Sequence, residues 1–223
     1  MLNRLKTSLL ITTVCFSGLL VAQESVIYPI EIEGQTWQLT NLDLTQFQNG
    51  DETPQAQTPE EWKLAAKEGT PAWCYFENRE DYGEKYGVLY NWYAVTDERG
   101  LAPEGRWIPT RVEYDSLCKA IGCENIPIKF KAKGEWLNGE EVTNESGFAA
   151  LPAGSRTPQG EFIDGGALDA KLSTGLESTA WWTKDESNKQ KAYAYVLSHT
   201  GTWGSVAVNK GYGYSVRLVR AAQ

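Results

Sequence analysis

The sequence predicts an α+β domain with two short helices and many short antiparallel strands. Each helix is marked by a capping box, and both lie in the first part of the chain. The second half instead contains short β-like runs separated by turn clusters. Helices and strands do not alternate as they do in a doubly wound parallel sheet. We therefore expect a single α+β domain over residues 23–223, with a loop-rich C-terminal half.

The first 22 residues have the pattern of a secretory signal peptide. Arg4 and Lys6 precede an apolar run that ends at Val21, and the small Ala22 offers a cleavage position. The apolar run is shorter than the ~20 residues that a spanning helix needs. We therefore expect an exported protein, either periplasmic, on the outer surface or secreted, with no transmembrane segment after signal cleavage.

The mature chain is expected to begin with a hairpin and then a helix. Residues 28–39 contain two β-like runs around a turn at Glu33-Gly34, with the alternation of half-buried strands. A polar loop follows over residues 46–57. The motif Thr58-Pro59-Glu60-Glu61 then combines a cap, a proline in the first turn and a capping-box glutamate. It predicts a short helix that Gly69 ends.

An aromatic region separates this helix from the second one. Residues 72–76 are expected to form a strand, residues 77–84 an acidic turn-rich loop, and residues 86–95 a buried segment rich in rings and β-branched side chains. A second capping box at Thr110–Glu113 opens a helix that runs to Gly122. Its predicted apolar face consists of Val112, Tyr114, Leu117, Ala120 and Ile121.

Beyond Gly122 the sequence shows no further strong helix. Short apolar runs there are bounded by Gly, Asn, Ser and Thr clusters, which is typical of strands joined by turns. These runs are residues 148–151, 180–183, 192–197, 205–208 and 214–219. The second half should therefore be rich in strands and loops.

Composition and charge exclude some functions. A formal charge of -8, from 29 acidic and 21 basic residues, gives phosphate backbones little to bind, so no nucleic-acid partner is expected. His199 is the only histidine and no paired C-x-x-C motif occurs, so we expect no metal site and no cofactor. Aromatic residues make up 12% of the chain, which argues against disorder.

Three cysteines remain after signal cleavage: Cys74, Cys118 and Cys123. Cys118 and Cys123 lie at the end of the second predicted helix, close enough to be joined if the chain turns at Gly122. Two interpretations stay open. Cys118 and Cys123 form a structural disulfide, or all three cysteines are buried thiols.

Three blocks of sequence resemble one bacterial family, the Fibrobacter succinogenes major paralogous domain. They are Tyr86–Val95, Gly100–Thr110 and Asn144–Arg156, and shorter matches include Gly213-Tyr-Ser-Val-Arg217. The resemblance implies a C-type-lectin-like fold, related in architecture to formylglycine-generating enzymes, in exported or surface proteins of Bacteroidetes-type bacteria. It provides no established catalytic or ligand-binding residue to carry over.

Two departures from that family concern local packing. Its usual cysteine pair is replaced here by Ala102, or its neighbour Leu101, and by Leu218. Its usual Gly-Trp-x-Ile-Pro is replaced by Gly105-Arg106-Trp107-Ile108-Pro109. Because neighbouring strand residues face opposite sides, this exchange should turn a large ring to the other side unless the backbone bulges.

The motifs of known enzymes and lectins are missing from the sequence. The calcium motifs of C-type lectins and the paired redox cysteines of formylglycine generation do not occur. A catalytic triad would have to use His199, without a G-x-S-x-G elbow to present the serine. Carboxylate pairs such as Glu60/Glu61 and Glu140/Glu141 are candidates for glycoside cleavage, and they and the aromatic residues are the only basis for an enzyme.

Aromatic side chains are the remaining candidates for ligand contacts. Trp203 and Tyr212 each lie between glycines and are expected to be exposed. Tyr193 and Tyr195 share one strand face, opposite Ala192, Ala194 and Val196. Either the tyrosines form an exposed platform, or their face packs inside. Such rings can stack on sugars or anchor a protein partner.

The leading hypothesis is a secreted or surface-exposed, non-catalytic binding module whose ligand is a glycan or an envelope or extracellular protein. The first alternative is an enzyme that acts on an extracellular polysaccharide. The second alternative is a structural component of the cell envelope.

Overall fold

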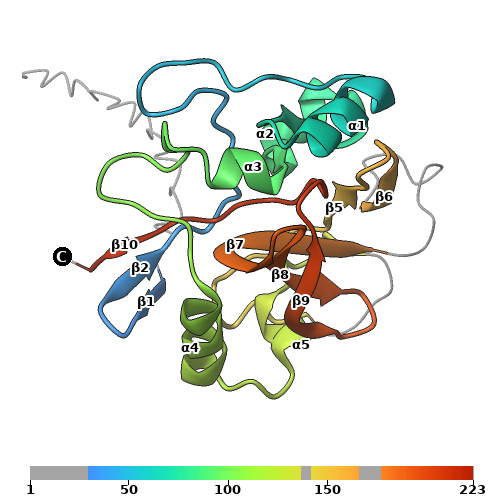
Figure 1. Ribbon diagram of the computed structural model, residues 1–223. Coiled ribbons are helices and arrows are strands. Elements are labelled where there is room, and N and C mark those ends of the chain that lie inside the picture. Colours follow the sequence, from blue (N-terminus) through green and yellow to red (C-terminus); the bar gives the residue numbers. More distant parts are fainter. Residues whose placement is uncertain (1–29, 137–141, 166–176, 223) are drawn as a thin grey trace, which may run out of the picture.

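The computed structural model describes residues 30–136, 142–165 and 177–222, and its central element is a five-stranded sheet (Figure 1). The strands lie in the order β6-β5-β7-β8-β9, with the bounds Ala153–Arg156 (β5), Phe162–Gly165 (β6), Ser178–Asn188 (β7), Lys191–Ser198 (β8) and Trp203–Asn209 (β9). Neighbouring strands are antiparallel except β5 and β7, which are parallel. The chain reverses direction twice between these two strands, so they point the same way. The α+β class is confirmed, and most strand pairs are antiparallel as expected, with β5 and β7 as the parallel pair in this sheet.

Short helices pack against both faces of this sheet. They are α1 (Pro59–Glu68), α2 (Glu80–Tyr86), α3 (Trp92–Val95), α4 (Arg111–Ile121) and α5 (Ile126–Phe130). Figure 1 shows α1, α2 and α3 above the sheet and α4 and α5 below it. The sheet therefore separates two layers of helices.

Two neighbouring tryptophans of β7 belong to the two different cores. Side chains of adjacent strand residues point to opposite faces. Trp182 packs in the core that contains Trp92 of α3, which we call the α3 core. Trp181 packs in the core that contains Tyr114 of α4 and Phe130 of α5, which we call the α4 core. A third cluster surrounds Trp62 of α1.

Both capping boxes predicted from the sequence are present. At α1 the Thr58 hydroxyl accepts from the Glu61 backbone N–H, the Glu61 carboxylate accepts from the Thr58 backbone N–H, and Gly69 ends the helix at φ 71°. At α4 the residues Thr110 and Glu113 form the same pair, and Gly122 caps the other end. Both helices are confirmed.

The predicted apolar face of α4 is partly wrong. Its buried side chains are Tyr114, Leu117 and Cys118, whereas Val112 is 70% exposed and Ala120 is also exposed. Residues two apart in a helix point roughly 200° away from each other. Because Tyr114 faces the core, Val112 faces solvent.

Sequence reasoning missed three short helices. α2 lies where an acidic loop was expected, α3 lies within the aromatic segment, and α5 follows α4 directly. Helices this short are held by tertiary contacts and leave little periodic signal. The burial predicted for residues 86–95 is confirmed at most positions. Within this segment, β4 (Leu89–Tyr90) pairs with β3 (Trp73–Cys74), and a 3-10 turn over Phe76–Asn78 follows β3 in the chain.

The N-terminal hairpin is confirmed and is completed by the C-terminal strand. β1 (Ile30–Ile32) and β2 (Gln35–Trp37) pair around the turn at Glu33-Gly34. β10 (Val219–Ala221) pairs antiparallel with β2 on its other side. Trp107 then forms a bridge to Val219 of β10. Both edges of β10 are therefore occupied, at least in part.

The expected signal peptide, residues 1–22, lies outside the described residues. Within the ranges described, no helix has the length and apolar character that crossing a membrane requires.

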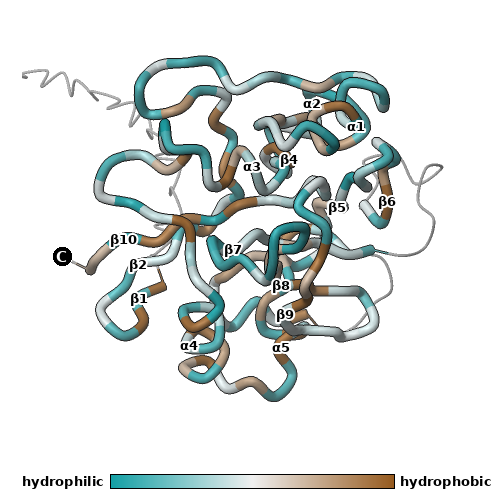
Figure 2. The backbone as a smooth tube through the Cα atoms, in the orientation of Figure 1, coloured by the Kyte–Doolittle hydropathy of each residue, from teal (hydrophilic) through white to brown (hydrophobic). Residues whose placement is uncertain are grey.

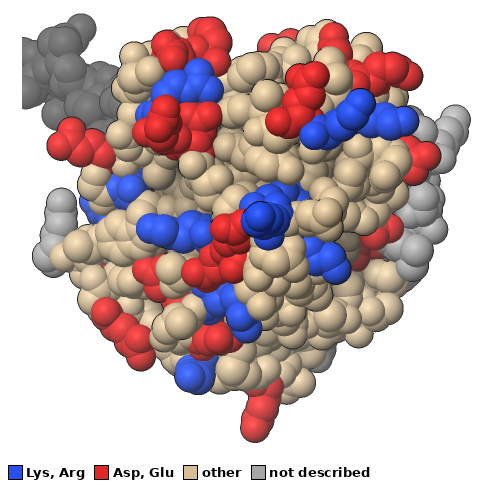
Figure 3. All heavy atoms as spheres, viewed as in Figure 1, with Lys and Arg blue, Asp and Glu red and all other residues tan. Residues whose placement is uncertain are grey.

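The polar loop over residues 46–57 runs along the top of the view and is mostly hydrophilic (Figure 2). On the face drawn in Figure 3, acidic and basic side chains are interspersed.

Candidate functional site

A cavity of about 530 Å³ lies where the end of α4, α5 and the start of β9 meet, and we call it the Trp203 pocket. It is lined by Cys118, Cys123, Asn125, Ile126, Pro127, Ile128, Gly201 and Trp203. None of these residues carries a charge. The pocket is therefore suited to an uncharged ligand surface.

Trp203 forms one wall of this pocket and is half-buried. Its ring centroid lies 4.9 Å from that of Phe130 and 5.1 Å from that of Tyr195. Tyr114 and Trp181 contact the ring at slightly longer range. The expected exposure of Trp203 is therefore only partial, because the ring packs against the α4 core and leaves the rest of its surface to line the cavity.

The opposite wall is a short loop stabilised at both ends. Cys118 and Cys123 are bridged, with their Cα atoms 4.9 Å apart. The Lys129 ammonium donates to the Ile121 carbonyl over 2.9 Å. Asn125 follows in the left-handed region at φ 61°, and its side chain does not cap α5. The Asn125 amide is therefore free to face a ligand.

Tyr193 and Tyr195 do not form an exposed platform. Tyr195 is buried, its ring stacks on Tyr114 at 4.7 Å between centroids, and its hydroxyl donates to Asp115 of α4. Tyr193 is half-buried beneath the Arg111 guanidinium, which lies 4.0 Å from the ring centroid. Because α4 covers this strand face, the alternative in which the tyrosine face packs inside is the one observed.

Tyr212 lies on the opposite side of the sheet from Trp203. It is half-buried and stacks on Tyr214 at 5.4 Å between centroids, and Tyr214 packs against Trp182 in the α3 core. The expected exposure of Tyr212 is therefore only partial. Trp203 and Tyr212 contribute to two separate surfaces rather than to one site.

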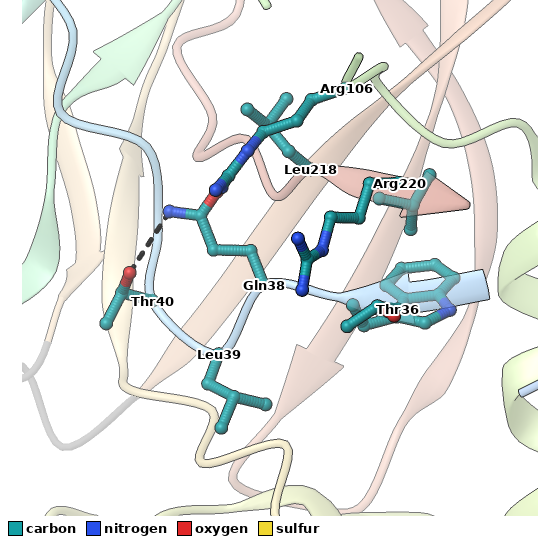
Figure 4. Close-up of a pocket in the computed structure, with 9 residues that line it drawn as sticks. Thr36, Gln38, Leu39, Thr40, Arg106, Leu218 and Arg220 are labelled. Carbon is teal, nitrogen blue, oxygen red and sulfur yellow. Dashed lines mark hydrogen bonds between the residues drawn. The ribbon is translucent and has the colours of Figure 1, made fainter. Parts of the chain in front are cut away.

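A second cavity, of about 310 Å³, lies over β2 and β10 and was not anticipated from the sequence. We call it the arginine pocket. Its lining includes Arg106 and Arg220 together with the polar side chains of Thr36, Gln38 and Thr40 (Figure 4). The exchange of Arg106 and Trp107 relative to the family pattern is visible in the sequence, but it points neither to Arg220 nor to a cavity. The side chain of Trp107 packs partly inside and donates to Glu113 over 2.7 Å, while Arg106 is exposed.

Two of the ionisable residues considered as catalytic groups, Glu61 and His199, have structural contacts. The Glu61 carboxylate is hydrogen-bonded to the Thr58 and Gln57 backbone N–H groups, which lower its pKa. His199 Nδ1 lies 3.3 Å from the Glu177 backbone nitrogen. Glu140 and Glu141 lie outside the described residues. Among the residues that the structure describes, no three His, Cys, Asp or Glu side chains gather in a way that could hold a metal ion.

The sequence of residues 30–220 matches the family model of the Fibrobacter succinogenes major domain. The chain belongs to that family. No curated protein and no solved structure matches the chain significantly. The blocks that resemble the Fibrobacter succinogenes major domain are mainly structural here. For example, Arg217 is buried with its guanidinium 4.0 Å from the Phe148 ring centroid, and it donates to the Phe148 carbonyl.

The missing cysteine pair of the Fibrobacter succinogenes major domain is replaced by apolar packing. Leu101 and Leu218 are both buried in the α3 core, and Ala102 packs against it. This part of the domain is therefore held without a covalent link between these positions.

Proposed function

We propose that this protein is an exported, non-catalytic binding module of C-type-lectin-like architecture that holds a glycan in the Trp203 pocket. The observation that carries the proposal is a half-buried tryptophan lining an uncharged cavity large enough for a sugar ring. An aromatic face packs against the C–H groups of a sugar, and a nearby amide forms hydrogen bonds with the hydroxyl groups of the sugar. Trp203 and Asn125, which both line the pocket, supply these two groups.

Preorganisation supports this choice of site. The Trp203 ring is fixed by its contacts with Phe130 and Tyr195, and the facing loop is closed by the Cys118–Cys123 bridge. A wall that is already ordered loses little conformational entropy when a ligand binds. A concave site that combines apolar and aromatic side chains with a few polar groups is a common form of ligand site.

A glycan array with the mature protein tests the proposal, together with two pocket variants. Asn125→Gly removes the amide while keeping a residue that accepts φ 61°. Trp203→Phe keeps an aromatic ring within the α4 core but reduces the stacking surface. Both variants should fold and should weaken glycan binding at least tenfold, because Asn125→Gly removes a hydrogen bond to the ligand and Trp203→Phe reduces the stacking area. Trp203→Ala is unsuitable, since deleting this ring should lower the free energy of unfolding by about 2–4 kcal/mol.

Asn78→Gly is the matched control, because Asn78 also has a positive φ of 55° and lies outside the pocket. It should bind glycans like the unmodified protein. Equal binding by all variants would place the site elsewhere. Retention of an envelope protein without any glycan would favour a protein partner or the structural alternative, and shortened oligosaccharides in the eluate would favour the enzyme.

A further inference from the structure

We propose that the arginine pocket is a second binding site, specific for the carboxylate groups of an acidic oligosaccharide. It is distinct from the Trp203 pocket, and the two cavities share no lining residue. The pocket combines cations that form no ion pair within the described ranges with neutral polar groups, and it continues into a neighbouring cavity.

Two guanidinium groups line this cavity without an acidic partner. Figure 4 shows the side chains of Arg106 and Arg220 both directed toward Gln38. Neither arginine forms an ion pair within the described ranges, whereas Arg79 and Arg99 do. Two cations beside one cavity repel each other, and an anion between them replaces that repulsion with attraction. Guanidinium also matches the two oxygens of a carboxylate.

Neutral polar side chains complete the cavity. Gln38 Nε2 donates to the Thr40 hydroxyl over 3.1 Å, and Gln38 Oε1 is buried without a hydrogen-bond partner among the described residues. The Thr40 hydroxyl can donate as well as accept. The Thr40 hydroxyl, which accepts from Gln38, therefore keeps its own hydrogen to donate to a ligand oxygen. Such groups suit the hydroxyls that accompany the carboxylates of a sugar acid.

The cationic lining continues into a neighbouring cavity of about 340 Å³. Arg106 lines both cavities, and the second one adds Lys184. The acidic residue in its lining, Asp97, is already paired with Arg99 at 2.8 Å. Three cations thus follow one another along two adjoining cavities. This arrangement fits a chain with several carboxylates better than a single small anion.

The strand pairing disfavours an acidic peptide as the ligand. Peptides commonly bind a sheet by adding a strand to a free edge. β2 lies between β1 and β10, and Trp107 bridges to Val219 on the outer side of β10. At β2 and at Val219 of β10 the backbone is already paired, which favours recognition through side chains, as in oligosaccharide binding.

Calorimetric titration of the mature protein with tetragalacturonate tests this site. Arg106→Gln and Arg220→Gln should each weaken binding at least tenfold, because each removes a charged hydrogen bond. Raising the salt concentration should weaken binding to the unmodified protein. Arg79→Gln is the control: it removes the same positive charge at the ion pair with Asp81, and this variant should bind tetragalacturonate like the unmodified protein.

Several results would overturn the proposal. These are the absence of tetragalacturonate binding, equal affinity for neutral galactose tetramers, or unchanged affinity in both arginine variants. A tetra-aspartate peptide that binds as tightly would show that the ligand class is wrong. Asn125→Gly should leave the affinity for tetragalacturonate unchanged. A failure of the proposal for the arginine pocket can therefore be distinguished from a failure of the proposal for the Trp203 pocket.

Discussion

The Trp181 indole N–H donates to the Asn41 side-chain oxygen over 2.8 Å, although the two residues are 140 positions apart. The same oxygen accepts from Arg217 Nε at 3.2 Å. Asn41 Nδ2 in turn donates to the Tyr86 carbonyl and the Ser215 hydroxyl. One buried amide therefore joins β7, the C-terminal segment and the end of α2.

Replacing this amide should destabilise the whole domain. Asn41→Leu leaves the Trp181 and Arg217 donors buried without this acceptor, which should lower the free energy of unfolding by about 2–4 kcal/mol. Urea denaturation measures the change. Asn49→Ala is the control: Asn49 makes an exposed local contact with Asp51, and its loss should cost less than about 1 kcal/mol. Equal effects of the two variants would contradict the role given to Asn41.

Glu113 should make stability depend on pH in the acid range. Burial alone would raise its pKa, but hydrogen bonds from the Thr110 backbone, Trp107, the Thr110 hydroxyl and Gln35 together lower it below 4.5. A depressed carboxyl pKa contributes stability above the unfolded value, and this contribution is lost as pH falls through the folded value. Glu113→Gln should flatten the stability profile below about pH 4.5. An unchanged slope in this variant would count against the assignment.

The bridge between Cys118 and Cys123 should stabilise the loop beside the Trp203 pocket. The short loop that it closes predicts a contribution of about 2 kcal/mol. Peptide mapping of the unreduced protein should recover the two cysteines in one linked fragment, and the Cys118→Ser/Cys123→Ser double variant should unfold at a lower temperature. Recovery of both cysteines as free thiols from the mature protein would refute the bridge.

The Cys74 thiol should react only slowly with alkylating reagents in the folded protein. Its thiol is fully buried, and desolvation raises its pKa to about 12 despite the nearby Arg156. The thiolate is the reactive form, so alkylation at pH 8 should be at least ~100-fold slower than in urea. Labelling followed by mass spectrometry measures both rates. Rapid labelling of the native protein would show that this core opens readily.

Local signals in the sequence predicted the elements that depend on local chemistry. Both capping boxes and the turn at Glu33-Gly34 were found in this way, because each motif satisfies its own backbone groups. The helix α5 was missed because five residues are too few to show periodicity. Whether the tyrosine face of β8 packs inside was left open, because the answer depends on α4, a distant segment that covers Tyr195.

The candidate site was predicted less completely than the fold. Trp203 was identified as a candidate, but its four ring contacts come from segments that the sequence does not place beside it. The arginine pocket was missed because Arg106 and Arg220 meet only through the pairing of β2, β10 and Trp107. Long-range pairing of this kind leaves no local pattern around either arginine.

Direct observation of a bound sugar at Trp203 tests the central claim most sharply. NMR spectra of the mature protein, titrated with the glycans retained on the array, should show the largest shifts at the Trp203 indole and the Asn125 amide, with the sugar unchanged after long incubation. Shifts confined to other surfaces, or cleavage of the glycan, would contradict the assignment of a non-catalytic binding site to this cavity.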